Sequence, residues 1–330
     1  MKRVLITGAC GSIGKQLAKR LLDDGEKVCV FDNNEDGLFN LKNEFSQFSK
    51  NLRVFLGDIR DEKRLIQAFN NVEEVYHCAA LKHVELNEYN PFEAMQTNVI
   101  GTNNVVSAAI KNNVKKVLIT SSDKAVNPSS LMGTTKLLAE KLAISANNQT
   151  GDNDVNIGCV RFGNVWNTNG SVGRIFRNQI INNKDITVTD KNMSRFFISI
   201  KDAVDLCIES CRDLIGGEIF ISDMGAATIG HLANEFSKHN KKIKVVETGL
   251  KAGEKLYEEL FTDVESTRTY VYQNMYVIIP DSLDPNNSRL DRLNKKYKVN
   301  KPIGEALRSD SVIAKKIDMS NMVKDIIDGS

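Results

Sequence analysis

The first half of the chain alternates short apolar, β-branched runs with segments of helical periodicity. The runs expected to form strands cover residues 3–7, 27–32, 53–56, 74–78, 117–120 and 156–161. Helices are expected between them, at residues 12–24, 62–69, 92–112 and 132–147. Strands that alternate with helices pair in parallel, with helices covering both faces of the sheet. The pattern therefore predicts an α/β fold with a doubly wound parallel sheet, whose ligands bind beyond the carboxyl ends of the strands.

The second half is less regular. A polar, glycine-bearing stretch, RFGNVWNTNGSVG, follows the last of these strands and is interpreted as a linker. At 330 residues the chain is long enough for two packed units. We expect a sheet domain at residues 1–165, to which 197–222 return through a helix at 201–212 and a strand at 218–222. Residues 166–196 and 223–330 are expected to form a smaller mixed α/β region.

Charge and cysteine content exclude several classes of partner. Forty-four Lys and Arg balance forty-two Asp and Glu to a net +2, without a long block of one sign. This favours a small-molecule partner over a nucleic acid or a membrane surface. The start MKRVLITG is too short for a signal-peptide core, and no apolar run reaches the length of a membrane span. Six cysteines without CxxC spacing indicate reduced thiols and no metal site, so a cytoplasmic enzyme is expected.

A glycine-rich loop follows the first expected strand. In TGACGSIG, Gly8, Gly11 and Gly14 precede an amphipathic helix. Glycine lets the loop turn sharply, and it lets backbone amides approach a pyrophosphate at the positive end of the helix. A tight turn that only packs the helix against the strand is the alternative. The order strand, loop, helix favours a dinucleotide site.

Asp32 ends the second expected strand in VFDNNED. A carboxylate there can accept hydrogen bonds from an adenosine ribose, although it can also be a simple turn residue. The residues that follow, Asn33, Asn34 and Glu35, provide no cation for a 2′-phosphate, which favours NAD over NADP. Asp58 in GDIRD follows the third strand and is either a contact to the adenine or an ordinary loop carboxylate.

Four polar residues end the fifth expected strand, at the edge where such a sheet holds its reacting groups. They are Ser121, Ser122, Asp123 and Lys124. An Asp beside a Lys can be a surface ion pair of little energy, or it can be an acid and a base. Met132 lies one helical turn before Lys136, where a tyrosine would complete a familiar hydride-transfer dyad.

Taken together, these motifs resemble extended short-chain dehydrogenase/reductases, and specifically the 4,6-dehydratases that act on UDP-N-acetylglucosamine. The resemblance covers almost the whole chain. The motifs are highly specific together, whereas any one of them alone would be a weak signal. The matching stretches are TGACGSIG, HCAALKHVELNE, TNVIGT, SSDKAVNPSSLMGTTK, RFGNV, TVTDKNMSRFF, GGEIF and TGLKAGEKLYEEL.

The resemblance implies a Rossmann domain that binds NAD and a smaller region for the nucleotide sugar. In the family, hydride leaves sugar carbon 4, water is lost across carbons 5 and 6, and the hydride returns to carbon 6. The enzyme is thus a lyase without net redox change. By resemblance, Asp123 is the general acid toward the departing hydroxyl and Lys124 the base at carbon 5. A lysine can act as a base only with a depressed pKa, which we expect from a desolvated cleft that also contains Lys136.

Met132 places the chain with one branch of this family. A thioether has no proton to exchange, so another group must take the proton of the 4-hydroxyl. Members with methionine here, many of them large and membrane-anchored, retain the configuration at carbon 5, whereas inverting relatives carry tyrosine. We therefore expect retention, with Asp123, Lys136 or a water relayed through Ser122 taking that proton.

The resemblance also suggests further contacts. Lys136 is expected to hold the nicotinamide ribose, and Lys82 and Asn98 to lie near cofactor and substrate. Arg195 is expected at the diphosphate and Glu254 at the uridine ribose. Other expected cofactor contacts are Ser12, Ile13, Ile59, Ala79, Ala80 and Ser121, and other expected substrate contacts are Asn164 and Lys251. The chain departs from the family at Lys251-Ala252, where relatives read Arg-Pro, and at Arg174, where proline is common.

Three other functions are compatible with this sequence. An inverting dehydratase or a UDP-sugar 4-epimerase would share the cofactor and the nucleotide, but both normally keep the tyrosine. A protein that binds NAD and UDP-sugar without turnover would not need the Asp123-Lys124 pair. Relatives associate through helices that correspond to residues 92–112 and 132–147, so a homo-oligomer, dimeric or larger, is expected.

Overall fold

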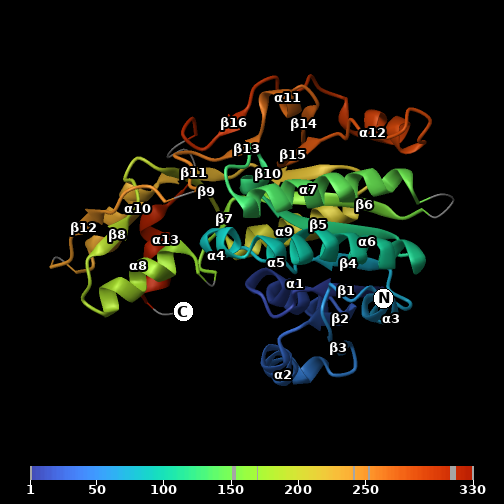
Figure 1. Ribbon diagram of the computed structural model, residues 1–330, viewed down its shortest axis with the longest axis horizontal. Helices are drawn as coiled ribbons and strands as arrows, with labels where there is room; N and C mark the ends of the chain where they lie inside the picture. The colour runs from blue at the N-terminus through green and yellow to red at the C-terminus, as the bar shows by residue number, and fades with distance from the viewer. Residues whose placement is uncertain are drawn as a thin grey trace.

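A computed structural model describes residues 2–150, 154–168, 170–240, 242–251, 253–312 and 317–328. Its main element is a nine-stranded sheet in the order β14-β15-β10-β6-β5-β4-β1-β2-β3 (Figure 1). The strands are β1 (Arg3–Thr7), β2 (Lys27–Asp32), β3 (Leu52–Leu56), β4 (Glu74–His77), β5 (Lys116–Ser122), β6 (Asn156–Phe162), β10 (Ile219–Ser222), β14 (Thr269–Tyr272) and β15 (Met275–Ile278). All neighbours from β3 to β10 pair in parallel, and β15 and β14 add an antiparallel edge.

Helices cover both faces of this sheet. On one face α3 (Glu62–Ala68), α6 (Gly101–Lys111) and α7 (Leu131–Ser145) pack side by side, and on the other α1 (Ser12–Asp23) packs against α9 (Ile200–Asp213). Right-handed crossovers explain this, because the strand order runs one way from β1 to β3 and the other way from β4 to β10. The reversal between β1 and β4 opens a crevice at their carboxyl ends.

The sequence therefore predicts the doubly wound α/β fold correctly, but two elements differ from expectation. The helix expected at 92–112 is α5 (Pro91–Met95), a π-helical turn (Gln96–Ile100) and α6. The turn directs Asn98 into the interior, where it bonds the backbone of Leu81. The second difference is the hairpin β14-β15, which was expected in the smaller region. It extends the main sheet, because β15 pairs with β10 along four residue pairs.

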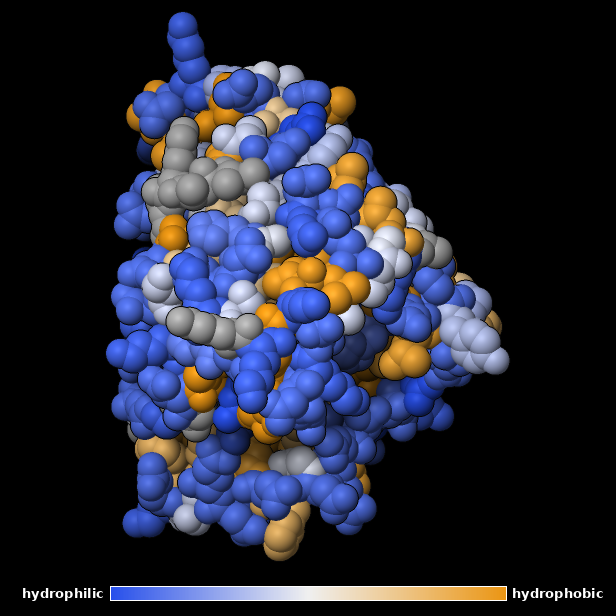
Figure 2. Space-filling model, turned by 90° about the vertical axis from the view of Figure 1, so that its left-hand side faces the viewer, coloured by the Kyte–Doolittle hydropathy of each residue, from blue (hydrophilic) through white to orange (hydrophobic). Residues whose placement is uncertain are grey.

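The smaller region lies beside the carboxyl ends of the strands, at the left of Figure 1. It contains a sheet of β11 (Gly225–Thr228), β9 (Ser194–Ile198) and β7 (Asn164–Val165), and the pair β8 (Ile186–Val188) and β12 (Val245–Glu247). Helices α8 (Val172–Ile181), α10 (Ile229–Ser237) and α13 (Met319–Ile327) close it around a separate core with Trp166, Phe176 and Phe236. Its outer face is mainly hydrophilic, with small apolar patches (Figure 2).

The remaining elements fill the periphery. They are α2 (Glu35–Glu44), α4 (Val84–Tyr89), α11 (Asp263–Ser266), α12 (Arg289–Tyr297), β13 (Glu259–Phe261), β16 (Leu307–Arg308) and single 3₁₀ turns at Ser46–Phe48, Asp123–Ala125 and Ala146–Asn148. Strand β13 packs against the turn Asp123–Ala125. A late segment of the chain is thereby brought against the loop that carries the expected acid and base.

Candidate active site

A cleft of about 710 Å³ opens at the carboxyl ends of the central strands and runs to the smaller region. Most of the residues expected to bind a cofactor line it. These are Gly8, Gly11, Ser12, Ile13, Gly14, Asp32, Asp58, Ile59, Ala79, Ala80, Lys82, Ser121 and Lys136. Ser122, Lys124, Met132 and Asn164 line the same cleft, so the expected cofactor and reaction sites form one cavity.

The glycine loop has the backbone that a dinucleotide pyrophosphate requires. Gly8 has φ +68°, and a Cβ there would lie 2.5 Å from the backbone N of Ala79. No side chain caps α1 at Gly11, and its first turn carries no acidic residue. No side-chain cap or carboxylate therefore competes with an anion at this helix start, and the helix dipole favours negative charge there. The residues present fit a bound dinucleotide.

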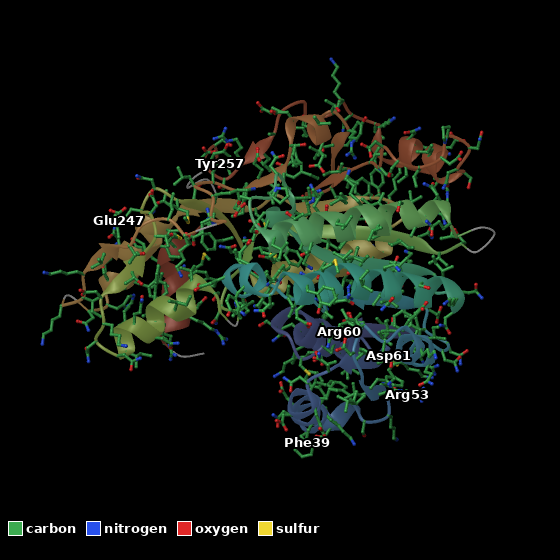
Figure 3. All side chains as sticks on the ribbon, viewed as in Figure 1. Phe39, Arg53, Arg60, Asp61, Glu247 and Tyr257 are labelled. Atoms are coloured by element: carbon green, nitrogen blue, oxygen red, sulfur yellow. The ribbon has the colours of Figure 1, made fainter. Side chains whose placement is uncertain are left out.

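Asp32 lies beside this loop. One carboxylate oxygen accepts from the backbone N of Cys10 at 2.9 Å, and the other from that of Asn34 at 3.0 Å. These bonds fix the carboxylate at the end of β2, in reach of a ribose. Asp58 accepts hydrogen bonds from Nε and Nη2 of Arg60, which lowers the pKa of Asp58. Arg60, labelled in Figure 3, also pairs with Glu93.

The expected acid and base, Asp123 and Lys124, belong to one hydrogen-bonded group. Asp123 Oδ1 accepts from Ser122 Oγ at 2.7 Å and from Lys124 Nζ at 3.0 Å, and Lys124 Nζ also donates to Asn164 Oδ1 at 3.1 Å. Asp123 is fully buried and is not in the cleft wall, whereas Lys124 is. The second carboxylate oxygen, Asp123 Oδ2, has no hydrogen-bond partner among the described residues. Lys124 thus stands between a buried carboxylate and the cavity.

The expectation of a depressed pKa at Lys124 is wrong for this structure. Burial acts to lower it, but the carboxylates of Asp123 and Glu258 outweigh burial, and the pKa of Lys124 is raised. The effect expected there occurs instead at Lys136, whose pKa is lowered mainly by burial. Lys136 Nζ donates to the backbone O of Thr120 at 3.0 Å. Met132, one turn earlier on α7, is 3% exposed and borders the same cavity.

Lys82, in the loop after β4, and Asn98, in the π-helical turn before α6, differ in whether they face the cleft. Lys82 faces the cleft, and partial burial lowers its pKa. Asn98 is buried away from it. Its amide bonds the backbone N and O of Leu81 and donates to Thr135 Oγ1 at 3.0 Å, so it holds the loop after β4 against α7.

Of the expected substrate contacts, Asn164 lies in the cleft wall and three others do not. Arg195 is buried beneath it, where its guanidinium donates to the backbone O of Ser194 and of Lys255. Lys251 Nζ lies 3.3 Å from Glu85 Oε2 on α4, and Glu254 accepts from the backbone N of Lys251. The structure therefore gathers cofactor and reaction residues but does not bring the last three to the cavity.

Two further residues lie at this site without being indicated by the sequence motifs. Trp166 borders the cavity from the linker and makes an edge contact with Phe197. Glu258 is 4% exposed and lies 3.9 Å from Lys124 Nζ. The stretch EKLYEEL contains Glu258, but carboxylates are mostly exposed and nothing in this stretch marks one as buried. The partner of Glu258 likewise could be identified only in the folded chain.

Comparison with known proteins finds one matching family and relatives that align over most of this chain. Residues 4–280 match a family described as polysaccharide biosynthesis protein. An uncharacterized membrane protein of Methanocaldococcus jannaschii is 42% identical over 304 residues, which are 89% of this chain and 91% of that protein. A UDP-N-acetylglucosamine 4,6-dehydratase (inverting) of Campylobacter jejuni is 39% identical over 282 residues, or 84% of this chain and 83% of the relative.

A solved structure matches almost completely. The X-ray structure of Pen from Bacillus thuringiensis has a TM-score of 0.88 at 39% identity, and covers 99% of this chain and 97% of its own. In the part of the present chain that the structure describes, no helix has both the length and the apolar character to cross a membrane.

Proposed function

Because this chain belongs to the polysaccharide biosynthesis protein family, we propose that it is an NAD-dependent 4,6-dehydratase of UDP-N-acetylglucosamine that retains the configuration at carbon 5. The observation that carries the proposal is the hydrogen-bonded pair of Asp123 and Lys124 beside a cleft whose other end fits a dinucleotide. An oxidation alone needs no such pair, whereas the loss of water requires both an acid and a base.

The cofactor end of the cleft supports NAD. Bound NAD supplies a hydride acceptor that later returns the hydride. Gly8, Gly11 and the start of α1 hold the pyrophosphate, and Asp32 accepts from the adenosine ribose. Arg60 is the cation beside this end, and it is already paired with Asp58 and Glu93, which disfavours a 2′-phosphate there.

The proposed reaction needs four proton movements. The 4-hydroxyl and carbon 5 each lose a proton, and the departing 6-hydroxyl and carbon 5 each gain one. The pair Asp123 and Lys124 shares one proton across a 3.0 Å bond. When the proton moves from Lys124 to Asp123, the ion pair becomes an amine and a carboxylic acid, which are the base and the acid required. Exclusion of water by a bound sugar favours that neutral form.

The proposal of retention is supported by the side chains that can exchange a proton at this site. Inversion requires removal of a proton from one face and addition from the other, and hence two exchanging groups on opposite faces. Met132 offers no proton. The amine that removes the proton therefore returns it to the same face. For the 4-hydroxyl, Lys136 has the best support, since burial lowers its pKa and makes its neutral amine more accessible than that of an exposed lysine.

One incubation separates the alternatives. Protein with UDP-N-acetylglucosamine, followed by proton NMR in water and in deuterated water, should yield the 4-keto-6-deoxy sugar with unchanged configuration at carbon 5. The epimerised 4-keto product would indicate an inverting dehydratase. A product changed only at carbon 4 would indicate a 4-epimerase. Binding of the UDP-sugar without any product would indicate a binding protein.

A further inference from the structure

Glu258 reaches the active site from the late part of the chain. It immediately precedes β13, and its backbone N donates to Ser309 Oγ at 2.9 Å. Its neighbour Tyr257 marks the place in Figure 3, near the junction of the smaller region with the main sheet. The carboxylate is almost completely buried, which is costly for a charge unless cations compensate it.

Three cationic side chains compensate the buried charge of Glu258. Glu258 Oε1 lies 3.9 Å from Lys124 Nζ and 3.8 Å from Arg195 Nε, and Glu258 Oε2 lies 3.6 Å from Lys255 Nζ. Lys255 also donates to the backbone O of Val126, and Arg195 to that of Lys255. With Asp123, the cluster contains two buried carboxylates and three cations from three separate segments. Neither Asp123 Oδ2 nor Glu258 Oε2 accepts a hydrogen bond from a described residue.

In this arrangement the charge of Glu258 affects the protonation of both Lys124 and Asp123. Its negative charge favours the ammonium form of Lys124, and at the same time it disfavours a second negative charge on Asp123. Arg195 and Lys255 moderate both effects. Burial raises the pKa of Glu258, and Lys124, Asp123, Arg195 and Lys255 are the charged groups that face it.

We propose that Glu258 is a positioning residue of the active site, which holds Lys124 against Asp123 and determines how readily their shared proton moves from the ammonium to the carboxylate. This inference rests on the proposed function. The step itself is balanced within the pair: one N–H bond of Lys124 breaks, one O–H bond of Asp123 forms, and no proton leaves the pair. Arg195, expected at the diphosphate, acts here by fixing Glu258 and the backbone of Lys255.

The test measures the protonation of Lys124 directly, apart from turnover. The full chain, loaded with NAD, is labelled with acetic anhydride at a series of pH values, and mass spectrometry gives the midpoint for Lys124. Glu258→Gln removes the charge at nearly constant shape, so the midpoint should fall by about one pH unit or more. Glu258→Asp keeps the charge at a greater distance and should give a smaller fall.

The matched control is Glu259→Gln, which removes the adjacent carboxylate that accepts from Asn127 at the surface. It should leave the Lys124 midpoint unchanged, and Lys136 provides an internal reference in every sample. An unchanged Lys124 midpoint in folded Glu258→Gln overturns the inference, as does an equal fall in Glu259→Gln. If Glu258→Gln does not fold, Glu258→Asp is used to test the inference. An unchanged Lys124 midpoint in that variant also overturns it.

Turnover then distinguishes the two proposals. In wild type, formation of the 4-keto product tests the proposed function. In Glu258→Gln, the pH limb of kcat that follows Lys124 should shift to lower pH in parallel with the labelling midpoint, while KM changes little. If Glu258→Gln shifts the Lys124 midpoint but wild type makes no product, the proposed reaction is wrong and the electrostatic role of Glu258 still stands.

Discussion

At the scale of single residues, the geometry around Asp123 explains how a buried carboxylate can serve a reaction in a cavity that it does not face. Ser122 and Lys124 both bond Asp123 Oδ1, and Lys124 borders the cleft. A proton can therefore reach Asp123 through Lys124 or through Ser122. Both bonds end at Oδ1, so a proton that passes along either of them arrives at that oxygen, while Oδ2 has no hydrogen-bond partner among the described residues.

Removal of either member of the pair should abolish the elimination and spare cofactor binding. Asp123→Asn and Lys124→Ala each remove an acid–base group of the kind that contributes roughly 10²–10⁴-fold to rates. We expect formation of the 4-keto product to fall by about that factor, measured by absorbance of the product in alkali, with NAD affinity by fluorescence titration close to wild type. Near-normal turnover in both variants would remove the proposed mechanism.

Met132 provides a gain-of-function prediction. Met132→Tyr places a phenol one turn before Lys136, at the border of the cavity. This adds a second proton-exchanging group near carbon 5, so part of the product should have inverted configuration, detected by proton NMR. Met132→Leu, which keeps an apolar side chain of similar size, should retain configuration throughout. Identical products from both variants would show that position 132 does not determine the stereochemistry.

The residues of this site differ in how far the sequence predicts them. The glycine loop, Asp32 and the Ser121–Lys124 stretch each follow an expected strand, so the sheet places them at one edge. The protonation of Lys124 depends on Glu258, and the orientation of Arg195 on carbonyls of residues far along the chain. Such distant contacts have no local signature, which is why a depressed pKa was expected at Lys124 and is found at Lys136.

At the scale of elements, α7 is the one that must be held in place, because it carries Met132 and Lys136. A buried triad fixes it to its neighbours. Arg161 on β6 bonds Glu140 on α7 at 2.7 Å and Glu265 on α11 at 2.8 Å. All three side chains are buried or nearly so. The helix boundaries on either side follow from local signals, such as Ser130 at the start of α7, whose hydroxyl accepts from Gly133 N.

Breaking this triad should be far more costly than breaking an exposed pair. Arg161→Met leaves two buried carboxylates without their cation, so the free energy of unfolding should fall by about 3–5 kcal/mol. The comparison is Arg20→Met, which breaks surface pairs with Asp24 and Asp205 and should change it by less than about 1 kcal/mol. Urea denaturation followed by circular dichroism measures both, and similar losses in the two variants would contradict this account.

The buried contact between His77 on β4 and Thr102 on α6 should make the free energy of unfolding depend on pH. His77 is buried between Thr7 Oγ1 at 2.7 Å and Thr102 Oγ1 at 2.9 Å, and burial lowers its pKa from 6.5 to about 3. Thr102 gives its own hydrogen to Asn98 O, so it must accept from His77 Nε2. The neutral ring then donates on one side and accepts on the other.

Between pH 6.5 and about 3 the unfolded chain binds a proton at His77 that the folded protein does not. The free energy of unfolding therefore falls as the pH falls through this window, by up to about 1.4 kcal/mol per pH unit from this residue. Urea midpoints at a series of pH values should show the slope, and His77→Asn should flatten it. Equal slopes in the two proteins would assign the pH dependence to other groups.

Seven of the nine strands of the main sheet are predicted to within two residues, because strands buried on both faces appear as uninterrupted apolar runs. The sequence gives no bounds for β14, β15 or the short strands outside this sheet. It does not predict the π-helical turn inside 92–112. A single π-helical turn has no signature in the residue types, and Asn98 in this turn bonds the distant residue Leu81. The hairpin β14-β15 was likewise assigned to the wrong region, since its pairing with β10 has no local signal.

At the scale of the whole molecule, the cleft lies where the sheet meets the smaller region, and Asn164, Trp166 and Glu258 approach it from outside the first five strands. Helices α4, α5 and α7, which are in mutual contact, also carry a surface that the chain leaves exposed. Its large apolar side chains are Leu86 at 62% exposure, Tyr89 at 87%, Phe92 at 63%, Met95 at 38% and Leu138 at 47%.

Exposed apolar side chains gathered on adjacent helices indicate an association surface, and a second copy of this chain is the partner that we expect. Burial of this surface in a two-fold dimer should make Tyr89→Asp with Phe92→Asp shift the protein to monomer in sedimentation velocity, since each copy would bring two charges to the interface. Phe39→Asp is the control, because Phe39 is 65% exposed on α2, away from these helices at the bottom of Figure 3. If wild type is monomeric at micromolar concentration, or if the double variant sediments like wild type, the chain does not associate through these helices.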